Sequence, residues 1–221
     1  MVRRLIVAID GPSGAGKGTV ARSVSQTLGY RHIDTGAMYR AVGWQALHDG
    51  VPLDDEDRIT ALARAADIVV EGGVVSINRH DVTRAIRSAE IDKAAAAVAR
   101  LPRVREVLVA RQRAIGGQRG VVMEGRDIGT VVFPDADVKI YLDASPEERA
   151  RRRATDPAHS GGQAGQAAVA ASIEARDKSD TTRTASPLTL APDATLIDTT
   201  GVPIDEVVAR VMTLVDGKLK N

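Results

Sequence analysis

Short apolar runs alternate with helix-like patterns along most of the chain. The first run, LIVAI at residues 5–9, is continuously apolar and rich in β-branched side chains, as in a strand that is buried on both faces. It leads through a glycine-rich turn into a helical pattern over residues 16–28, where apolar side chains recur at fourfold spacing and Gly29 is the stop signal.

The same two patterns continue towards the carboxyl end. Further strands are expected at residues 121–123, 138–142 and 196–197, and further helices at residues 36–48, 94–115 and 204–219, the second with a break near Pro102. Strands that alternate with helices predict an α/β fold, in which a parallel sheet carries helices on both faces. The sequence contains no internal repeat.

Two segments depart from this alternation. Residues 68–78 contain two short β-rich runs joined at Gly72 and Gly73, a pattern that predicts a hairpin and suggests a small insert. Residues 155–171 are dominated by Gly, Ala, Gln and Ser and lack a large apolar anchor, so we expect them to be loosely packed and mobile.

Composition narrows the classes of protein that remain. A length of 221 residues with 43% apolar side chains fits one compact α/β domain, with or without a small appendage, and excludes disorder as the dominant state. A net charge of +1 argues against a nucleic-acid coat or a polybasic membrane anchor, and an aromatic content of 2% argues against base stacking on aromatic platforms. The absence of cysteine excludes disulfides and thiolate chemistry. Because residues 5–9 are too few for a secretory signal and no stretch has transmembrane length, we expect a soluble cytoplasmic protein.

The basic residues divide unevenly into 24 Arg and 6 Lys. Arginine presents a rigid fork that matches carboxylates and phosphates in two-point contacts, so the excess is consistent with oxyanion substrates. A genomic bias that favours Arg and Ala together explains the same numbers equally well, and both explanations stay open at this point.

The turn after the first strand carries the strongest chemical signal. Its sequence, GPSGAGKGT at residues 11–19, satisfies the P-loop pattern Gly-x4-Gly-Lys, in which backbone N–H groups and a helix N-terminus surround a polyphosphate while the lysine reaches its β and γ groups. Glycines are needed there because a Cβ atom would block the approach of backbone to phosphate. The predicted phosphate-binding residues are Gly11, Pro12, Ser13, Gly14, Ala15, Gly16, Lys17, Gly18 and Thr19.

One position departs from the usual P-loop. Gly18 follows the lysine where Ser or Thr normally binds the metal, and the hydroxyl comes one residue later at Thr19. We therefore predict no protein ligand to a metal and expect Mg²⁺ to be held mainly through water and the nucleotide phosphates.

Four more motifs, in this order along the chain, closely resemble the bacterial cytidylate kinase family. They are HIDTGAMYR at residues 32–40, LPRVR at 101–105, EGRDIGTVVFPDA at 124–136, and the set from Arg176 and Asp177 through Asp180 to Arg183. The resemblance implies a P-loop nucleoside monophosphate kinase that transfers a phosphoryl group from ATP to CMP or dCMP. It also implies a core of about residues 1–60, 101–148 and 172–221, a monophosphate-binding insert of about 61–100 and a mobile lid of about 149–171. Small nucleotides would be its only partners, with no nucleic acid or membrane, and the chain would be a monomer.

The motif positions carry the family's roles with them. By resemblance, Thr35, Arg40, Arg126 and Arg183 bind the acceptor phosphate, and Thr35 is also well placed to cap a helix that Gly36 opens. Asp127 and Arg105 would recognise the cytosine, which presents an amino donor beside ring acceptors, and Arg176 and Asp180 would bind the ribose. Arg103 lies about 200° from Arg105 on a helix, so at most one of the two can point at the substrate.

The predicted lid begins with three arginines on one helical face, Arg149, Arg152 and Arg153. Resemblance favours Arg152 and Arg153 as contacts to the ATP phosphates, although a solvated charged helix has the same pattern. Together with Lys17 and Arg126 they form the predicted catalytic set. No histidine is needed as a base, because in phosphoryl transfer the protein chiefly positions two nucleotides and neutralises charge.

The chain differs from the family at two positions. Ala96 stands where many relatives have a Ser near the base, so recognition of the base would rest on Arg105 and Asp127. Glu124 replaces an Asp before Gly125, at the end of a buried strand where a carboxylate would face Mg²⁺ or its waters.

Three alternatives remain on sequence grounds. Another small P-loop kinase, acting on AMP, UMP or a metabolite such as shikimate, would have a similar P-loop. A GTPase-type switch would use a D-x-x-G motif, which residues 198–201 match, but the guanine motif Asn-Lys-x-Asp is absent. RNA binding through residues 100–113 is the third alternative, and the apolar stripe of Val104, Val107, Leu108 and Ile115 argues against it because it indicates a helix packed on a core.

Overall fold

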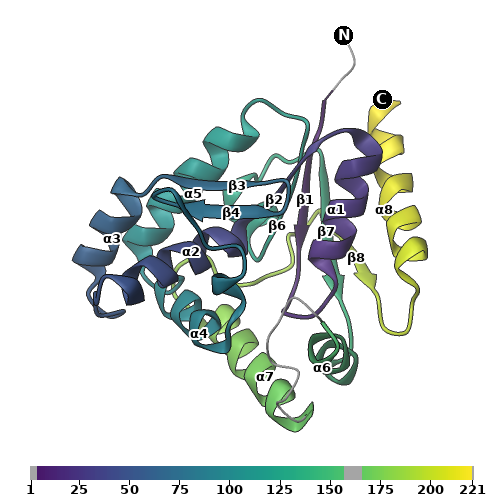
Figure 1. The fold of residues 1–221 in the computed structure, drawn as a ribbon. Coiled ribbons are helices and arrows are strands. Elements are labelled where there is room, and N and C mark those ends of the chain that lie inside the picture. The colour runs from purple at the N-terminus through teal and green to yellow at the C-terminus, as the bar shows by residue number, and fades with distance from the viewer. Residues whose placement is uncertain (1–3, 157–165, 221) are drawn as a thin grey trace.

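A five-stranded parallel sheet forms the centre of the molecule. The computed structural model describes residues 4–156 and 166–220, and Figure 1 shows their arrangement. All neighbouring strands of this sheet pair in parallel. Their order across the sheet is β2 (Arg31–Asp34), β6 (Val121–Gly125), β1 (Ile6–Asp10), β7 (Val138–Asp143) and β8 (Thr195–Asp198).

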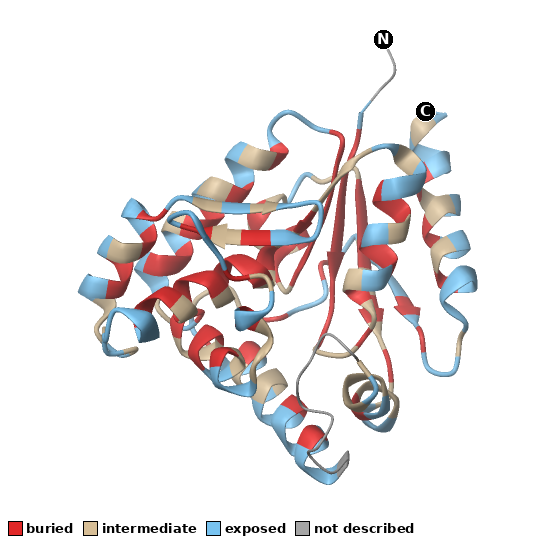
Figure 2. Cartoon of the chain, viewed as in Figure 1, coloured by how far each residue is buried: buried red, intermediate tan, exposed pale blue. Residues whose placement is uncertain are grey.

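Alternate side chains of β1 explain why helices cover both faces. Val7 and Ile9 pack with α1 (Lys17–Leu28) and α8 (Ile204–Leu219), whereas Ile6 and Ala8 pack with α5 (Pro102–Gly116) on the other face. Burial is concentrated in these strands and in the inner faces of the helices (Figure 2). The predicted fold class is confirmed.

A second, three-stranded sheet lies over α2 (Thr35–His48). Its strands β3 (Ile68–Glu71) and β4 (Val74–Ile77) form the predicted hairpin, in which Gly72 and Gly73 adopt positive φ angles of 59° and 85°. The third strand, β5 (His80–Asp81), was not predicted. It lies where the ring of Trp44 stacks on His48 and contacts His80, with ring centroids 4.9 Å and 5.8 Å apart.

The helical tract before β6 is divided as expected. Helix α4 (Ala89–Val98) ends before Pro102, which opens α5. Helix α4 packs closely on α2, since a Cβ atom at Gly43 would lie 3.1 Å from the Cβ of Ala94. Three elements were not predicted: α3 (Glu56–Ala65), a short helix capped by Asp55, the 3-10 turn η1 (Ala85–Arg87) and the π-helical turn η2 (Ile128–Val132).

Two helices flank the segment predicted to be loose. Helix α6 (Pro146–Ala154) precedes it, and residues 157–165 lie outside the described part of the chain. The prediction of a tract without an apolar anchor is wrong for its last residues, because α7 (Gln166–Thr182) has already begun and Val169 packs against Ala150 of α6. None of the helices in the described ranges is long and apolar enough to cross a membrane.

Candidate active site

The P-loop follows β1 and opens into α1. Gly11, Gly14 and Gly16 have φ angles of 144°, 80° and 89°, a region that side chains with a Cβ atom rarely adopt. At Gly11 a Cβ atom would also lie 2.0 Å from the carbonyl oxygen of Leu142. The sequence therefore needs glycines here, as predicted.

Lys17 is buried at the floor of this loop. Its ammonium group donates a hydrogen bond to the carbonyl oxygen of Pro12 at 2.7 Å. Burial lowers the pKa of Lys17 to about 7, and the nearby positive charge of Arg126 acts in the same direction. An anion that enters the loop favours the charged form of this lysine.

A cleft of about 440 Å³ opens beside the P-loop. Its walls come from the P-loop, the start of α2, the β3–β4 hairpin, α5, the end of β6, α6 and α7. Predicted site residues in its lining are Ser13, Gly14, Gly16, Lys17, Gly18, Thr19, Thr35, Arg40, Arg105, Arg126, Asp127, Arg152, Arg153, Arg176 and Arg183. Gly11, Pro12, Ala15 and Asp180 do not line it. The hairpin falls within the predicted monophosphate-binding insert of about 61–100, but its lining residues Val70 and Val75 were not singled out because they carry no chemical motif.

The start of α2 corrects one prediction. Thr35 is not the cap, because the carboxylate of Asp34 accepts the N–H of Ala37 at 3.0 Å and Thr35 is already helical. The hydroxyl of Thr35 instead donates to the carbonyl oxygen of Glu124 at 2.7 Å. Close to this helix start, Arg40 NH1 lies 3.3 Å from the position that a Cβ atom of Gly36 would take. A cation and a helix N-terminus thus meet at one point of the cleft, which suits an anion.

Arg105 and Asp127 form a buried ion pair at another part of the cleft. Their side chains are 3% and 8% exposed, and Arg105 NH2 donates to Asp127 Oδ2. The guanidinium of Arg105 also lies 5.3 Å from the ring centre of Tyr39, which sequence reasoning did not single out. The Nε atom of Arg105 has no hydrogen-bond partner among the described residues, so a buried donor remains for a ligand. Arg103 points elsewhere and pairs with Asp57 at the surface, as the helical geometry predicted.

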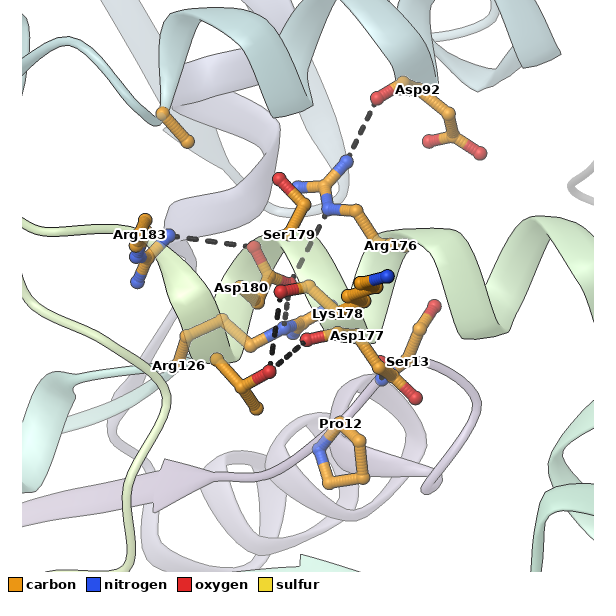
Figure 3. Close-up of polar contacts among 12 residues, drawn as sticks. Pro12, Ser13, Asp92, Arg126, Arg176, Asp177, Lys178, Ser179, Asp180 and Arg183 are labelled. Atoms are coloured by element: carbon orange, nitrogen blue, oxygen red, sulfur yellow. Dashed lines mark hydrogen bonds and ion pairs between the residues drawn. The ribbon is translucent and has the colours of Figure 1, made fainter.

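Asp180 lies at the centre of three arginines (Figure 3). Its carboxylate accepts from Arg126 Nε at 2.9 Å and pairs with Arg176 and Arg183 at 3.4 Å and 3.5 Å. Burial alone would raise the pKa of Asp180, but the three surrounding guanidinium groups hold it below its ordinary value. Burial lowers the pKa of Arg176 to about 10, and Arg126 and Arg40 add to this effect. The carboxylate therefore holds together positive charges that repel one another.

The lid arginines differ in their contacts. Arg152 bonds to Glu148 and to the hydroxyl and carbonyl oxygen of Thr199, and Arg153 pairs with Asp92. Arg149 does not line the cleft, because it bonds to Asp177 and to the carbonyl oxygen of Ser13. Of the three arginines on this helical face, Arg152 and Arg153 thus line the cleft, whereas Arg149 joins α6 to α7 and the P-loop.

The carboxylate of Glu124 lies where a P-loop usually places a hydroxyl. Its Oε1 atom is 3.2 Å from the position of a Cβ atom at Gly18, and His32 Nε2 lies 2.8 Å from the same oxygen. Oxygen donors of this kind fit Mg²⁺, and the hydroxyl of Thr19 lines the same cleft. Among residues 4–156 and 166–220, no group of three or more His, Asp or Glu side chains is placed to hold a metal. The carboxylate of Glu124 beside Gly18 thus fits Mg²⁺ by its chemistry.

Asp10, the last residue of β1, was also missed. Its two carboxylate oxygens accept the backbone N–H groups of Ile128 and Gly129 at 2.8 Å and 2.7 Å. Burial raises the pKa of Asp10 to about 6, although these two hydrogen bonds act against the rise. Because Arg126 and Asp127 directly precede the bonded residues, Asp10 fixes the turn that presents them to the cleft.

Fold and site together define the class of protein. The P-loop follows β1, the central strand of the parallel sheet, and opens to a cleft lined by arginines. This arrangement is a phosphotransferase site of the P-loop kinase class. The fold matches a gluconokinase from Sinorhizobium meliloti 1021 with a TM-score of 0.51 at 15% identity, over 99% of this chain and 97% of that one. A protein from Eubacterium ventriosum has a TM-score of 0.52 at 11% identity, over 96% of this chain and 99% of that one.

The chain belongs to the cytidylate kinase family, whose model matches residues 7–217. It is 48% identical to the cytidylate kinase of Solibacter usitatus, over 99% of this chain and 95% of the relative. It is 50% identical to that of Pelotomaculum thermopropionicum, over 95% of each chain. The predicted resemblance is confirmed, and the switch hypothesis is set aside. RNA binding is disfavoured independently, because Val104 and Leu108 of α5 are buried in the core.

Proposed function

We propose that this protein transfers the γ-phosphoryl group of ATP to CMP or dCMP. The observation that most strongly supports this proposal is the buried ion pair of Arg105 and Asp127, which lies in the same cleft as the P-loop. Cytosine presents an amino donor beside ring acceptors, so a carboxylate and a guanidinium together match its edge. Uracil reverses the donor and the acceptor, and a buried carboxylate would then face an oxygen without a proton between them.

The donor nucleotide fits on the P-loop side. Its β- and γ-phosphates would lie on the N–H groups of residues 11–19, with Lys17 beneath them and Arg152 above. A second cleft of about 240 Å³ shares Gly16, Thr19 and Arg152 with the first and continues between Arg151 and Ile204. We place the donor's adenosine there, because this cleft adjoins the P-loop on the side of α6 and α8.

The acceptor monophosphate fits at the start of α2. Thr35, Arg40, Arg126 and Arg183 line the cleft and would provide donors and positive charge for it. Arg176 would contact the ribose directly. Asp180 pairs with Arg126, Arg176 and Arg183 but does not line the cleft, so it would orient these three arginines. The sequence-based prediction that Asp180 binds a sugar hydroxyl stays a prediction.

Catalysis would then come from position and charge. Lys17, Arg126, Arg152 and Arg153 line the same cleft and would stabilise the charge that spreads over the transferring group. Bound Mg²⁺ would neutralise further charge on the donor phosphates. Glu124 would hold its waters, and His32 would keep the carboxylate of Glu124 in place.

The chain would divide into a core, an acceptor-binding insert and a lid. Residues of about 61–100 would form the acceptor-binding insert and residues of about 149–171 the lid, on a core of about 1–60, 101–148 and 172–221. A cytoplasmic location and a monomeric state stay predictions.

A panel of acceptors tests the proposal. ADP production is measured with CMP, dCMP, UMP, AMP and shikimate, and we expect CMP or dCMP to be preferred. Asp127→Asn should lower kcat/KM for CMP and narrow the preference over UMP by roughly tenfold or more, since one two-point base contact contributes about 1–3 kcal/mol. Asp57→Asn, which alters the exposed pair with Arg103, is the matched control and should change neither value. Preference for another acceptor would overturn the assignment.

A further inference from the structure

Asp92 of α4 contacts arginines from three other helices. Its Oδ1 accepts from Arg40 Nε at 3.0 Å, its Oδ2 pairs with Arg153, and its backbone carbonyl oxygen accepts from Arg176 NH1 at 2.8 Å. Figure 3 shows the last of these bonds, between α4 and α7. One residue thus joins α2, α6 and α7, which lie 52, 61 and 84 residues from it along the chain.

The three arginines line the cleft, whereas Asp92 does not. Asp92 therefore acts on a substrate only through them. Arginine carries five N–H donors. Asp92 uses the Nε of Arg40 and one terminal nitrogen of Arg153, so each guanidinium keeps further donors that can face the cleft. A guanidinium group that one hydrogen bond already holds in place loses less conformational entropy when its remaining N–H groups bind phosphate.

Charge explains why a carboxylate is needed at this point. Arg40 lowers the pKa values of both Arg153 and Arg176, in addition to the effect of burial, because the three cations lie close together. The carboxylate of Asp92 acts in the opposite direction on Arg40, Arg153 and Arg176. Without this carboxylate, Arg40 and Arg153 would repel each other and move apart.

We propose that Asp92 is a positioning residue that holds Arg40, on the acceptor side, beside Arg153 of the lid helix α6. The inference rests on the proposed function, in which Arg40 binds the acceptor phosphate and Arg153 the donor. Asp92 would keep the two sets of phosphate contacts at the spacing that in-line transfer requires, before either nucleotide arrives.

Kinetics of Asp92→Asn test this proposal, because the substitution removes the charge and keeps the size. We expect kcat for CMP to fall about tenfold and KM to rise severalfold. Asp92→Glu retains the charge on a longer arm and should recover at least a third of the lost rate. Glu90→Gln, an exposed change on the same helix, is the control and should leave both constants unchanged.

A double-mutant cycle separates positioning from a general structural role. In an Arg153→Ala background, Asp92→Asn should lower kcat by a smaller factor than in the wild type, since its partner in α6 is already gone and only the side-chain contact with Arg40 is lost. An equal loss in both backgrounds would overturn the proposal, and so would an unchanged or increased kcat in the single variant. Melting temperatures of all variants are recorded, and a loss of kcat that Asp92→Glu does not reverse counts against positioning.

Hydrogen exchange of the nucleotide-free protein gives a readout that needs no substrate. Asp92→Asn and Arg153→Ala should each speed exchange in α6 to the same extent, and the double variant should be no faster. Unchanged exchange in α6 would refute the tie between Asp92 and Arg153. If the wild type does not phosphorylate CMP, the proposed function fails while this measurement still tests the contact.

Discussion

At the scale of single residues, the site depends on charges that are buried in pairs or groups. The side chains of Asp180 and Asp127 are 2% and 8% exposed, and each is surrounded by guanidinium groups. Removing one member of such a group leaves the others uncompensated in a poorly hydrated place, which costs more than losing an exposed pair. Activity should therefore respond much more strongly to cleft arginines than to surface arginines.

Lys17→Ala and Arg126→Ala should each lower turnover by roughly a hundredfold or more, about 3 kcal/mol, because each removes a charge aimed at the transferring group. Steady-state ADP production measures the effect. Arg210→Ala, which breaks an exposed pair with Glu206 on α8, should leave turnover within a factor of about two. Near-normal turnover of either cleft variant would remove that residue from the mechanism.

Lys17 also predicts a proton uptake. With a pKa of about 7 in the empty site, it is mostly neutral at pH 8, and the anionic phosphates of ATP favour its charged form. Binding of ATP at pH 8 should therefore take up close to one proton, and binding at pH 6 should take up almost none at this residue. Calorimetry in buffers of different ionisation enthalpy measures the uptake. Lys17→Met should lower the uptake at pH 8 by close to one proton and should change the exchange at pH 6 little. A variant that keeps the wild-type uptake at pH 8 would assign the proton to another group.

At the scale of elements, close packing of α2 and α4 determines where the acceptor-side residues lie. Gly43 allows this approach, because a larger side chain would meet Ala94 and the backbone of Ala95 at 3.1–3.2 Å. Arg40 is on α2 and Asp92 is on α4, so the separation of the two helices determines whether these side chains can reach each other. A substitution at Gly43 should therefore affect both the packing of α2 on α4 and the contact between Arg40 and Asp92.

Gly43→Val should destabilise the fold by about 1–3 kcal/mol through overpacking and should raise KM for CMP by separating α2 from α4. Gly217 of α8 is the control, since a Cβ atom there meets nothing within 4 Å. Gly217→Ala should stabilise the protein by about 0.5–1 kcal/mol and leave KM unchanged. Urea unfolding and CMP titrations measure both. Equal effects of the two substitutions would contradict the packing argument.

Periodicity predicted most of these elements, but it could not predict their contacts. The strands of the large sheet are continuous apolar runs and were recognised, whereas α3 is a short helix with few large apolar residues and was missed. The P-loop and five of the cleft arginines (Arg40, Arg105, Arg126, Arg176 and Arg183) lie within motifs, whereas Arg22 and Arg87 also line the cleft but lie in none and were not predicted. Asp10 and Asp92 were not predicted either, because their partners come from segments between 50 and 120 residues away, and only the folded chain brings those together. Thr35 shows the limit of local rules, since Asp34 is an equally good cap and takes that position.

At the scale of the whole molecule, α6 and α7 contact the other walls of the cleft through charged side chains. Arg153 connects α6 with α4, Arg176 connects α7 with α4, and Arg149 connects α6 with α7 and the P-loop. Among the described residues, Val169 and Ile173 of α7 form a small apolar cluster with Ala150 and Ala154 of α6. Contacts of this kind exchange readily when phosphates compete for the same arginines.

Helices α6 and α7 should therefore become better ordered when both nucleotides bind. Hydrogen exchange in residues 149–156 and 166–176 should slow more with CMP and a non-hydrolysable ATP analogue together than with either alone, because the two ligands engage different arginines. Exchange in α3, whose residues line neither cleft, serves as the internal control. Equal protection in all four states would count against closure of the lid.

The ring contacts of Trp44 have an optical consequence. The chain contains one tryptophan, and it stacks on His48 of α2 while it contacts His80 of β5. Indole emission of this protein therefore comes from a single junction between the small sheet and α2. Since the groups that contact an indole ring affect its emission, a displacement of β5 away from α2 changes the emission without any added dye. Movement of β5 relative to α2 can thus be followed in real time in the wild-type protein.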